Sequence, residues 1–150
     1  MSLVLPEDVI ARIRRHAERD YPREACGLLG GRPAGAEKRV ARIVPAVNAR
    51  ADRPGDRYLI EPEEFHRAAE ALAREGLEIV GVYHSHPDHP PRPSAFDREH
   101  ALPWLSYVIV EVRAGRARVE RSWLLADDRG AFVEEEIRTE EGSVAWQSRS

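Results

Sequence analysis

The feature that most constrains this chain is a short apolar run, residues 78–83, that leads into two histidines and then into a cluster of prolines. The run is rich in β-branched and apolar residues, which predicts a largely buried strand. His84 and His86 follow at a spacing of two, so in an extended chain both imidazoles point to one face while Ser85 points away from them. Four prolines within residues 87–93 cannot continue a strand ladder, and they predict a stiff loop.

Two imidazoles on one face can clamp one metal ion, and a carboxylate follows at a suitable place. Residues 94–102 open with Ser94-Ala-Phe-Asp97, which predicts a short helix with Asp97 on its first turn. Two histidines, one aspartate and a water would complete a tetrahedral zinc site with one position open for chemistry. Ser-x-x-Asp is also a helix capping box, and taken alone the pair favours helix capping over metal binding.

The histidine pair, the Ser-x-x-Asp pair and an upstream glutamate together resemble the JAMM (MPN-plus) metallopeptidase family. The family pattern is a distant glutamate followed by His-x-His-x(7)-Ser-x-x-Asp. This sequence has Glu24 in Arg-Glu-Ala-Cys-Gly-Leu-Leu-Gly-Gly, then His84-Ser-His86-Pro, then Ser94-Ala-Phe-Asp97, with the full spacing. In overall length the chain is similar to the small, stand-alone prokaryotic members.

The resemblance implies a ligand set and a reaction. It implies one zinc ion per chain on His84, His86 and Asp97. Glu24 would be the general base and acid, and Ser94 would donate a hydrogen bond to the oxyanion. The reaction would be hydrolysis of a peptide or isopeptide bond by metal-activated water.

The resemblance also implies a protein substrate. JAMM relatives cut after the C-terminal tail of ubiquitin-like proteins, and small prokaryotic members include processors of ubiquitin-like sulfur carriers. We therefore expect such a protein as the partner, with linear trimming and removal from lysines both open. A family insertion helps to hold the substrate tail, so residues 48–57 are expected to form a substrate-binding rim.

Two other readings of the same residues remain open. His84-Ser-His86-Pro-Asp88-His89 matches the His-x-His-x-Asp-His signature of the metallo-β-lactamase fold, in which Asp88 and His89 would be ligands. That fold requires further ligands on a longer chain, and here the only later histidine is His100. The second alternative is a non-catalytic MPN scaffold that binds protein partners, which a missing ligand would favour; none is missing.

The remaining pattern predicts one mixed α/β domain. Helices are expected at residues 6–20 and 62–75, besides the short one after the prolines. Strands are expected at residues 25–30, 39–47, 58–60, 107–112, 116–125 and 131–137. This order favours a single mixed β-sheet flanked by helices. More specifically, the resemblance implies the fold of the JAMM core, which is similar to the cytidine deaminase architecture. We expect the domain to span residues 1–138 and residues 139–150 to be a frayed tail.

The sequence also predicts whether several side chains are buried or exposed. Val47 is expected in the core, Trp104 and Trp123 as packing anchors, and residues 134–136 in solvent. The histidines outside the motif are expected to be ordinary surface residues; they are His16, His66 and His100.

Composition excludes some classes of function. The net charge is -3, with 23 Lys and Arg against 26 Asp and Glu, which gives no support for nucleic-acid binding. No apolar run approaches the ~20 residues of a membrane helix, and the N-terminus lacks a signal-peptide pattern. The single cysteine, Cys26, is expected to be a buried, inert thiol and agrees with a cytoplasmic location. The oligomeric state is left open.

Overall fold

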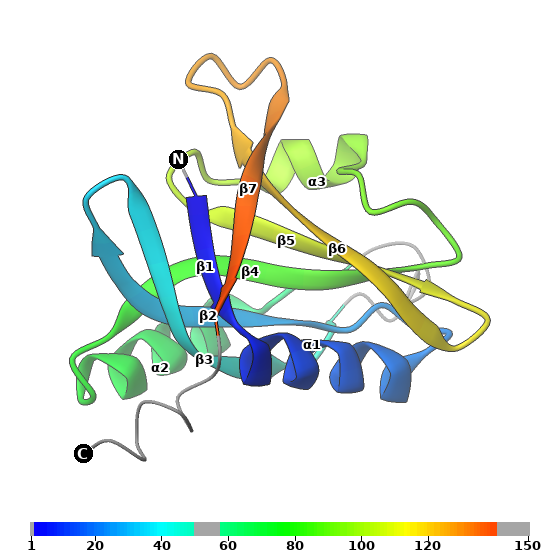
Figure 1. The fold of residues 1–150 in the computed structure, drawn as a ribbon, viewed down its shortest axis with the longest axis horizontal. Helices are drawn as coiled ribbons and strands as arrows, with labels where there is room; N and C mark the ends of the chain where they lie inside the picture. The colour runs from blue at the N-terminus through cyan, green and yellow to red at the C-terminus, as the bar shows by residue number, and fades with distance from the viewer. Residues whose placement is uncertain (1, 50–57, 141–150) are drawn as a thin grey trace.

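The structure, a computed structural model, describes residues 2–49 and 58–140. Three helices interrupt a series of strands along this part of the chain (Figure 1). The elements are β1 (Ser2–Pro6), α1 (Glu7–Asp20), β2 (Cys26–Ala34), β3 (Glu37–Ala46), α2 (Pro62–Ala73), β4 (Glu78–Pro87), α3 (Ala95–His100), β5 (Ser106–Arg113), β6 (Arg116–Leu125) and β7 (Phe132–Glu140). None of the helices in the described ranges has the length and apolarity that a bilayer crossing requires.

The strands form one mixed sheet that closes on itself. Their order is β1-β3-β2-β4-β5-β6-β7, and β1 pairs in parallel with both β3 and β7. β4 lies inside the sheet, antiparallel to β2 and parallel to β5. The mixed sheet with flanking helices confirms the expected fold class. The closing strand β1 was not expected, because Leu3, Val4 and Leu5 are all buried and give no alternating pattern.

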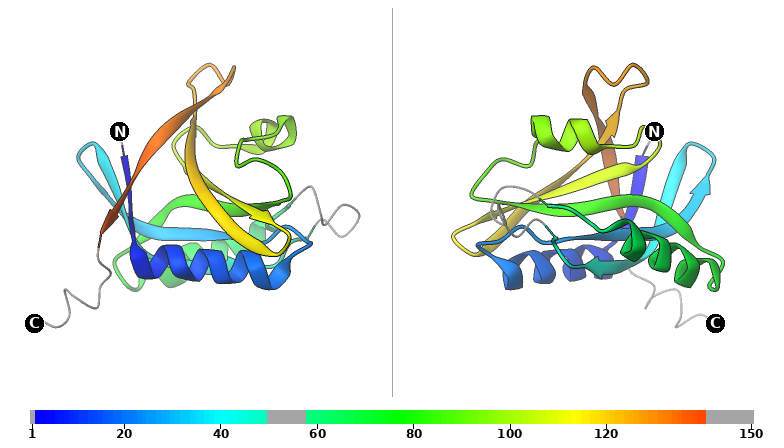
Figure 2. Two further views of the ribbon diagram at one scale, coloured as in Figure 1. Left: turned by 45° about the vertical axis from the view of Figure 1, so that its right-hand side comes forward. Right: turned by 180° about the vertical axis from the view of Figure 1, so that it is seen from behind.

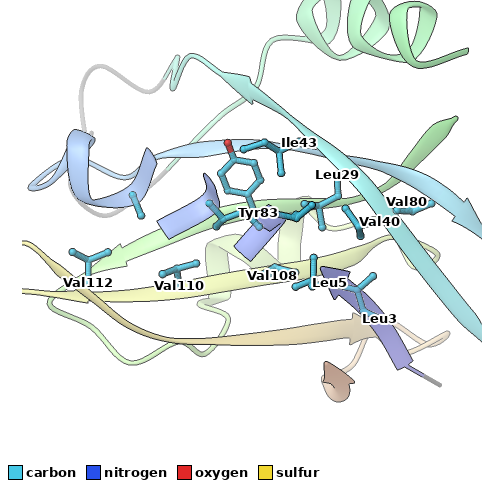
Figure 3. Close-up of a cluster of buried hydrophobic side chains, with 13 residues drawn as sticks. Leu3, Leu5, Leu29, Val40, Ile43, Val80, Tyr83, Val108, Val110 and Val112 are labelled. Carbon is cyan, nitrogen blue, oxygen red and sulfur yellow. The ribbon is translucent and has the colours of Figure 1, made fainter. Parts of the chain in front are cut away.

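Each face of the sheet packs against different helices. Val9 and Ile13 of α1 join Tyr83 of β4 in the cluster that Figure 3 shows, together with side chains of β1, β2, β3 and β5. Ala68 and Leu72 of α2 belong to a second cluster with residues of β2, β4 and β5. In Figures 1 and 2, α1 and α3 lie on opposite sides of β4 and β5. Because β4 has helices on both sides, its backbone is held firmly where the histidines lie.

The element boundaries differ from the expected ones at three places. β4 continues to Pro87, so His84 and His86 lie within the strand rather than just after it. β2 continues to Ala34, where a hairpin loop was expected from Gly30 onwards. Residues 58–60 are not a strand, although Leu59 exchanges hydrogen bonds with Asn48 and Ala49.

Some expected burial assignments were wrong as well. Val47 is 72% exposed because β3 ends one residue before it, and Trp104 is 59% exposed. Glu135 is buried and accepts a hydrogen bond from the Ser122 hydroxyl (2.8 Å). β7 reaches Glu140, two residues past the expected domain boundary. The rest of the expected tail lies outside the described residues, as do residues 50–57 of the expected substrate rim.

His16 was expected at the surface, but it is buried between α1 and β4. Its Nδ1 lies 2.7 Å from the Tyr83 hydroxyl, and its Nε2 lies 3.2 Å from a carboxylate oxygen of Asp20. Burial lowers the pKa of His16 despite the nearby Asp20 carboxylate, so the ring is neutral at pH 7. The contact ties α1 to β4 at the residue immediately before His84.

Gly27→Ala is expected to destabilise the fold. An alanine Cβ at this position would lie 2.3 Å from the Tyr83 ring, which is buried and hydrogen-bonded to His16 and so cannot move aside. We expect the free energy of unfolding, measured by urea denaturation, to fall by about 1–3 kcal/mol. In a Tyr83→Leu background the same substitution should cost much less. An equal cost in both backgrounds would contradict the packing described here.

Candidate metal centre

β4 and α3 bring together three side chains that can each offer one metal ligand. His84, His86 and Asp97 are buried, and they are the one such group of three or more in the described part of the chain. The two Nε2 atoms lie 3.2 Å apart. Oδ2 of Asp97 lies 3.4 Å from each of them.

This triangle has the size that a zinc ion needs. Ligands about 2.0–2.1 Å from a tetrahedral ion lie about 3.3 Å from one another. The separations between the three donor atoms match this spacing. Two imidazole nitrogens and one carboxylate oxygen are also a donor set found in catalytic zinc sites. The residues present therefore fit a zinc ion.

Strand geometry explains the histidine half of the triangle. His84 pairs with Cys26 on β2 and Ile109 on β5, so its backbone is held from both sides. His84 and His86 point to one face as expected, and the ring of Tyr58 stacks on His84 with centroids 4.3 Å apart.

The proline-rich loop orients His86. Nδ1 of His86 lies 2.8 Å from the carbonyl oxygen of Pro90. Because that carbonyl can only accept, Nδ1 carries the hydrogen, and the lone pair of Nε2 faces Asp97. The stiff loop that the sequence predicts thus also sets the tautomer of a candidate ligand.

Asp97 serves the helix and the candidate site with the same oxygen. Oδ2 accepts a hydrogen bond from the Ser94 N–H (2.8 Å), while Ser94 Oγ accepts one from the Asp97 N–H (3.1 Å). These two bonds form the capping box of α3. The capping role expected from the sequence and the geometry of a ligand therefore coexist.

The protonation states within the triangle suit a cation. Burial lowers the pKa of His84, which favours a neutral imidazole with a free lone pair. Burial alone would raise the pKa of Asp97, but its contacts with His84 and His86 and the hydrogen bond from the Ser94 amide hold this pKa well below its usual range. Neutral imidazoles and an ionised carboxylate are the forms that bind metals.

Glu24 lies beside this triangle although it is 60 residues from His84 in sequence. It is buried, just before β2, and lines one pocket of about 440 Å³ together with His86 and Ser94. Ser85 holds the neighbouring backbone: its Oγ accepts from the Ala25 N–H (2.8 Å), and its N–H donates to the Ala25 carbonyl (3.0 Å). The sequence placed Ser85 on the opposite face from the histidines but gave no sign of this role.

Asp88 and His89 stand apart from the triangle. Asp88 directly follows β4, and it accepts hydrogen bonds from the Tyr21 hydroxyl (2.6 Å) and from the N–H of Ala114, which directly follows β5 (3.0 Å). His89 is exposed and lines only the rim of the pocket. The structure thus does not assemble the ligand set that the metallo-β-lactamase reading requires.

The remaining candidates behave as expected. Cys26 is buried, and burial raises the pKa of its thiol to about 12, so it is no nucleophile. His66 and His100 are exposed.

A second, mostly apolar groove of about 360 Å³ has Asp97 in its wall. Aromatic and aliphatic side chains from three regions form its walls, among them Tyr58, Phe65, Phe96 and Leu102. Local sequence patterns do not reveal this groove, because its walls come from segments far apart in the chain.

Comparison with known proteins agrees with this geometry. The family described as prokaryotic homologs of the JAB domain matches residues 6–126. A probable TtuB-protein conjugate cleaving protease of Thermus thermophilus is 36% identical over 117 residues, covering 78% of this chain and 75% of the relative. The CysO-cysteine peptidase of Mycobacterium tuberculosis is 34% identical over 140 residues, covering 93% and 92%. A solution structure of a Desulfitobacterium hafniense protein superposes with a TM-score of 0.81 at 34% identity, covering 94% of both chains. The chain therefore belongs to the family of prokaryotic JAB-domain proteins, and the JAMM resemblance of its motif is confirmed.

Proposed function

We propose that this protein is a zinc-dependent protease that cleaves a peptide or isopeptide bond at the C-terminal tail of a ubiquitin-like or sulfur-carrier protein. The observation that carries the proposal is the convergence of His84, His86 and Asp97 at zinc-ligand spacing, with Glu24 lining the adjoining pocket. Two relatives support the substrate class: a probable conjugate-cleaving protease of Thermus thermophilus and a CysO-cysteine peptidase of Mycobacterium tuberculosis.

The metal would supply Lewis acidity, which makes water nucleophilic near neutral pH and polarises the scissile carbonyl. Glu24 would take the proton of the attacking water and pass it to the leaving nitrogen. Its buried position next to His86 suits this role, because a carboxylate sheltered from bulk water keeps the transferred proton within the site. The peptide bond is then broken with one proton delivered to the amine and one hydroxyl to the acyl carbon.

Ser94 would stabilise the oxyanion. Its Oγ already accepts a hydrogen bond from the Asp97 N–H, which leaves the hydroxyl hydrogen to donate. The side chain is exposed and lines the pocket that Glu24 and His86 share, so a substrate carbonyl can reach it. One such bond is worth about 3 kcal/mol at the transition state.

The apolar groove gives the substrate a path to these groups. Asp97 lies in its wall, together with residues of the segment around Tyr58 and the segment around Leu102. An extended, apolar peptide can lie there with its scissile bond next to the metal ligands, as a flexible protein tail requires. We place the reaction in the cytoplasm, where a lone thiol such as that of Cys26 stays reduced.

Metal content tests the proposed ligand set. The purified wild type should carry about one zinc ion per chain, and His86→Ala and Asp97→Ala should lose it, because each removes one of three ligands. Elemental analysis of the purified proteins measures this. His89→Ala is the matched control, since it removes a neighbouring histidine outside the triangle and should leave the zinc in place. Loss of zinc in His89→Ala, or its absence from the wild type, would refute the ligand set.

One substitution of Glu24 separates catalysis from metal binding. Glu24→Gln should keep the wild-type zinc content but lose activity by about 10²- to 10⁴-fold, because the amide cannot accept the proton. The measurement is the cleavage rate of a ubiquitin-like protein carrying a C-terminal peptide extension. Wild-type cleavage by Glu24→Gln would exclude this residue as the base. Loss of zinc in the same variant would show that Glu24 contributes to metal binding rather than to proton transfer.

A further inference from the structure

The turn between β6 and β7 contacts the helix that carries Asp97. The guanidinium of Arg129 in this turn donates one hydrogen bond to the Ala101 carbonyl (2.9 Å). It donates two more to the carbonyls of Arg98 and Glu99 (3.2 Å each). All three acceptors are main-chain atoms at the C-terminal end of α3, and Figures 1 and 2 show the turn beside this helix.

These bonds satisfy groups that α3 cannot satisfy by itself. A helix leaves its last four carbonyls without internal partners, and one of six residues is only marginally stable in water. The N-terminal end of α3 is held by the capping box of Ser94 and Asp97. At the other end, a cation that binds the carbonyls also interacts favourably with the helix dipole.

The contact between the turn and the helix is reciprocal. Nη1 of Arg98 on α3 donates to the Gly130 carbonyl in the turn (3.1 Å). The turn has a defined shape, since Arg129 has a positive φ of 60° and Asp128 accepts from the Gly130 N–H (2.8 Å). From β6, the indole of Trp123 also donates to the Pro91 carbonyl (3.0 Å). The β6–β7 hairpin therefore holds both segments that orient candidate zinc ligands.

We propose that Arg129 is a positioning residue of the metal centre: it fixes the C-terminal end of α3 so that Asp97 stays at zinc-ligand distance from His84 and His86. The inference rests on the proposed function for the identity of the metal. Arg129 touches neither the ligand atoms nor the pocket that Glu24 lines, so it acts only through the helix backbone. Without it, α3 should open locally while the sheet stays folded.

The experiment measures the zinc dissociation constant by competition with a chromogenic chelator, with no substrate present. Arg129→Ala should weaken zinc binding about ten-fold or more, the usual effect of losing a group that orients a ligand. The visible absorption of the cobalt(II)-substituted protein should change too, because it reports the geometry around the ion. Arg129→Lys should restore part of the affinity, since one ammonium cannot span three carbonyls.

Arg121→Ala is the matched control. It removes an arginine of the same hairpin whose side chain makes an exposed ion pair with Glu134 (2.7 Å) and does not touch α3. It should keep the wild-type zinc affinity and cobalt spectrum.

Three outcomes would overturn the inference. A lower unfolding temperature of Arg129→Ala with unchanged zinc affinity and cobalt spectrum would mean that Arg129 is merely structural. If the alanine variant does not fold, wild-type affinity in Arg129→Lys would have the same meaning. A wild type that binds no zinc would remove the proposed metal centre itself, a failure visible before any Arg129 variant is compared.

Discussion

One oxygen atom, Oδ2 of Asp97, connects the folding of this protein to its chemistry. It accepts the N–H of Ser94 at 2.8 Å, and it lies 3.4 Å from the nearest nitrogens of His84 and His86. The first contact begins a helix, and the other two complete a triangle of zinc-ligand size. Any movement of α3 changes both together, so the helix cannot be loosened without disturbing the ligand geometry.

The candidate ligands come from two parts of the fold that differ in rigidity. His84 and His86 lie on a strand inside the sheet, paired on both sides and buried. Asp97 lies on a six-residue helix that follows a loop, and this helix depends on contacts at both of its ends. The strand provides a firm half of the site, and the helix provides a half whose position the surrounding loops and turns must secure.

The sequence predicted which three side chains come together, namely His84, His86 and Asp97, and it predicted the fold class. The ligand triangle follows from local spacing, because His-x-His on a strand and Ser-x-x-Asp at a helix start have nearly fixed geometry. The mixed sheet and its helices also follow from periodicity.

What the sequence could not predict depends on contacts between distant segments. The burial of His16 depends on Tyr83, 67 residues away, and the end of β3 before Val47 depends on pairing with β2. The hydrogen bonds of Arg129 to α3 likewise join segments about 30 residues apart, and nothing in its local sequence distinguishes it from the other arginines. The closure of the sheet by β1 has no local signal either.

The pairing that closes the sheet joins the first and last strands of the described chain. β1 (Ser2–Pro6) pairs with β7 (Phe132–Glu140), so this pairing must wait until residue 140 has left the ribosome. Until then the backbone edges of β1 and β6 are open to strands of other chains. The α1 helix, which directly follows β1 and packs on β3, gives the nascent sheet local contacts before its last strand arrives. During synthesis, before β7 pairs with β1, the sheet is thus exposed to pairing with other chains.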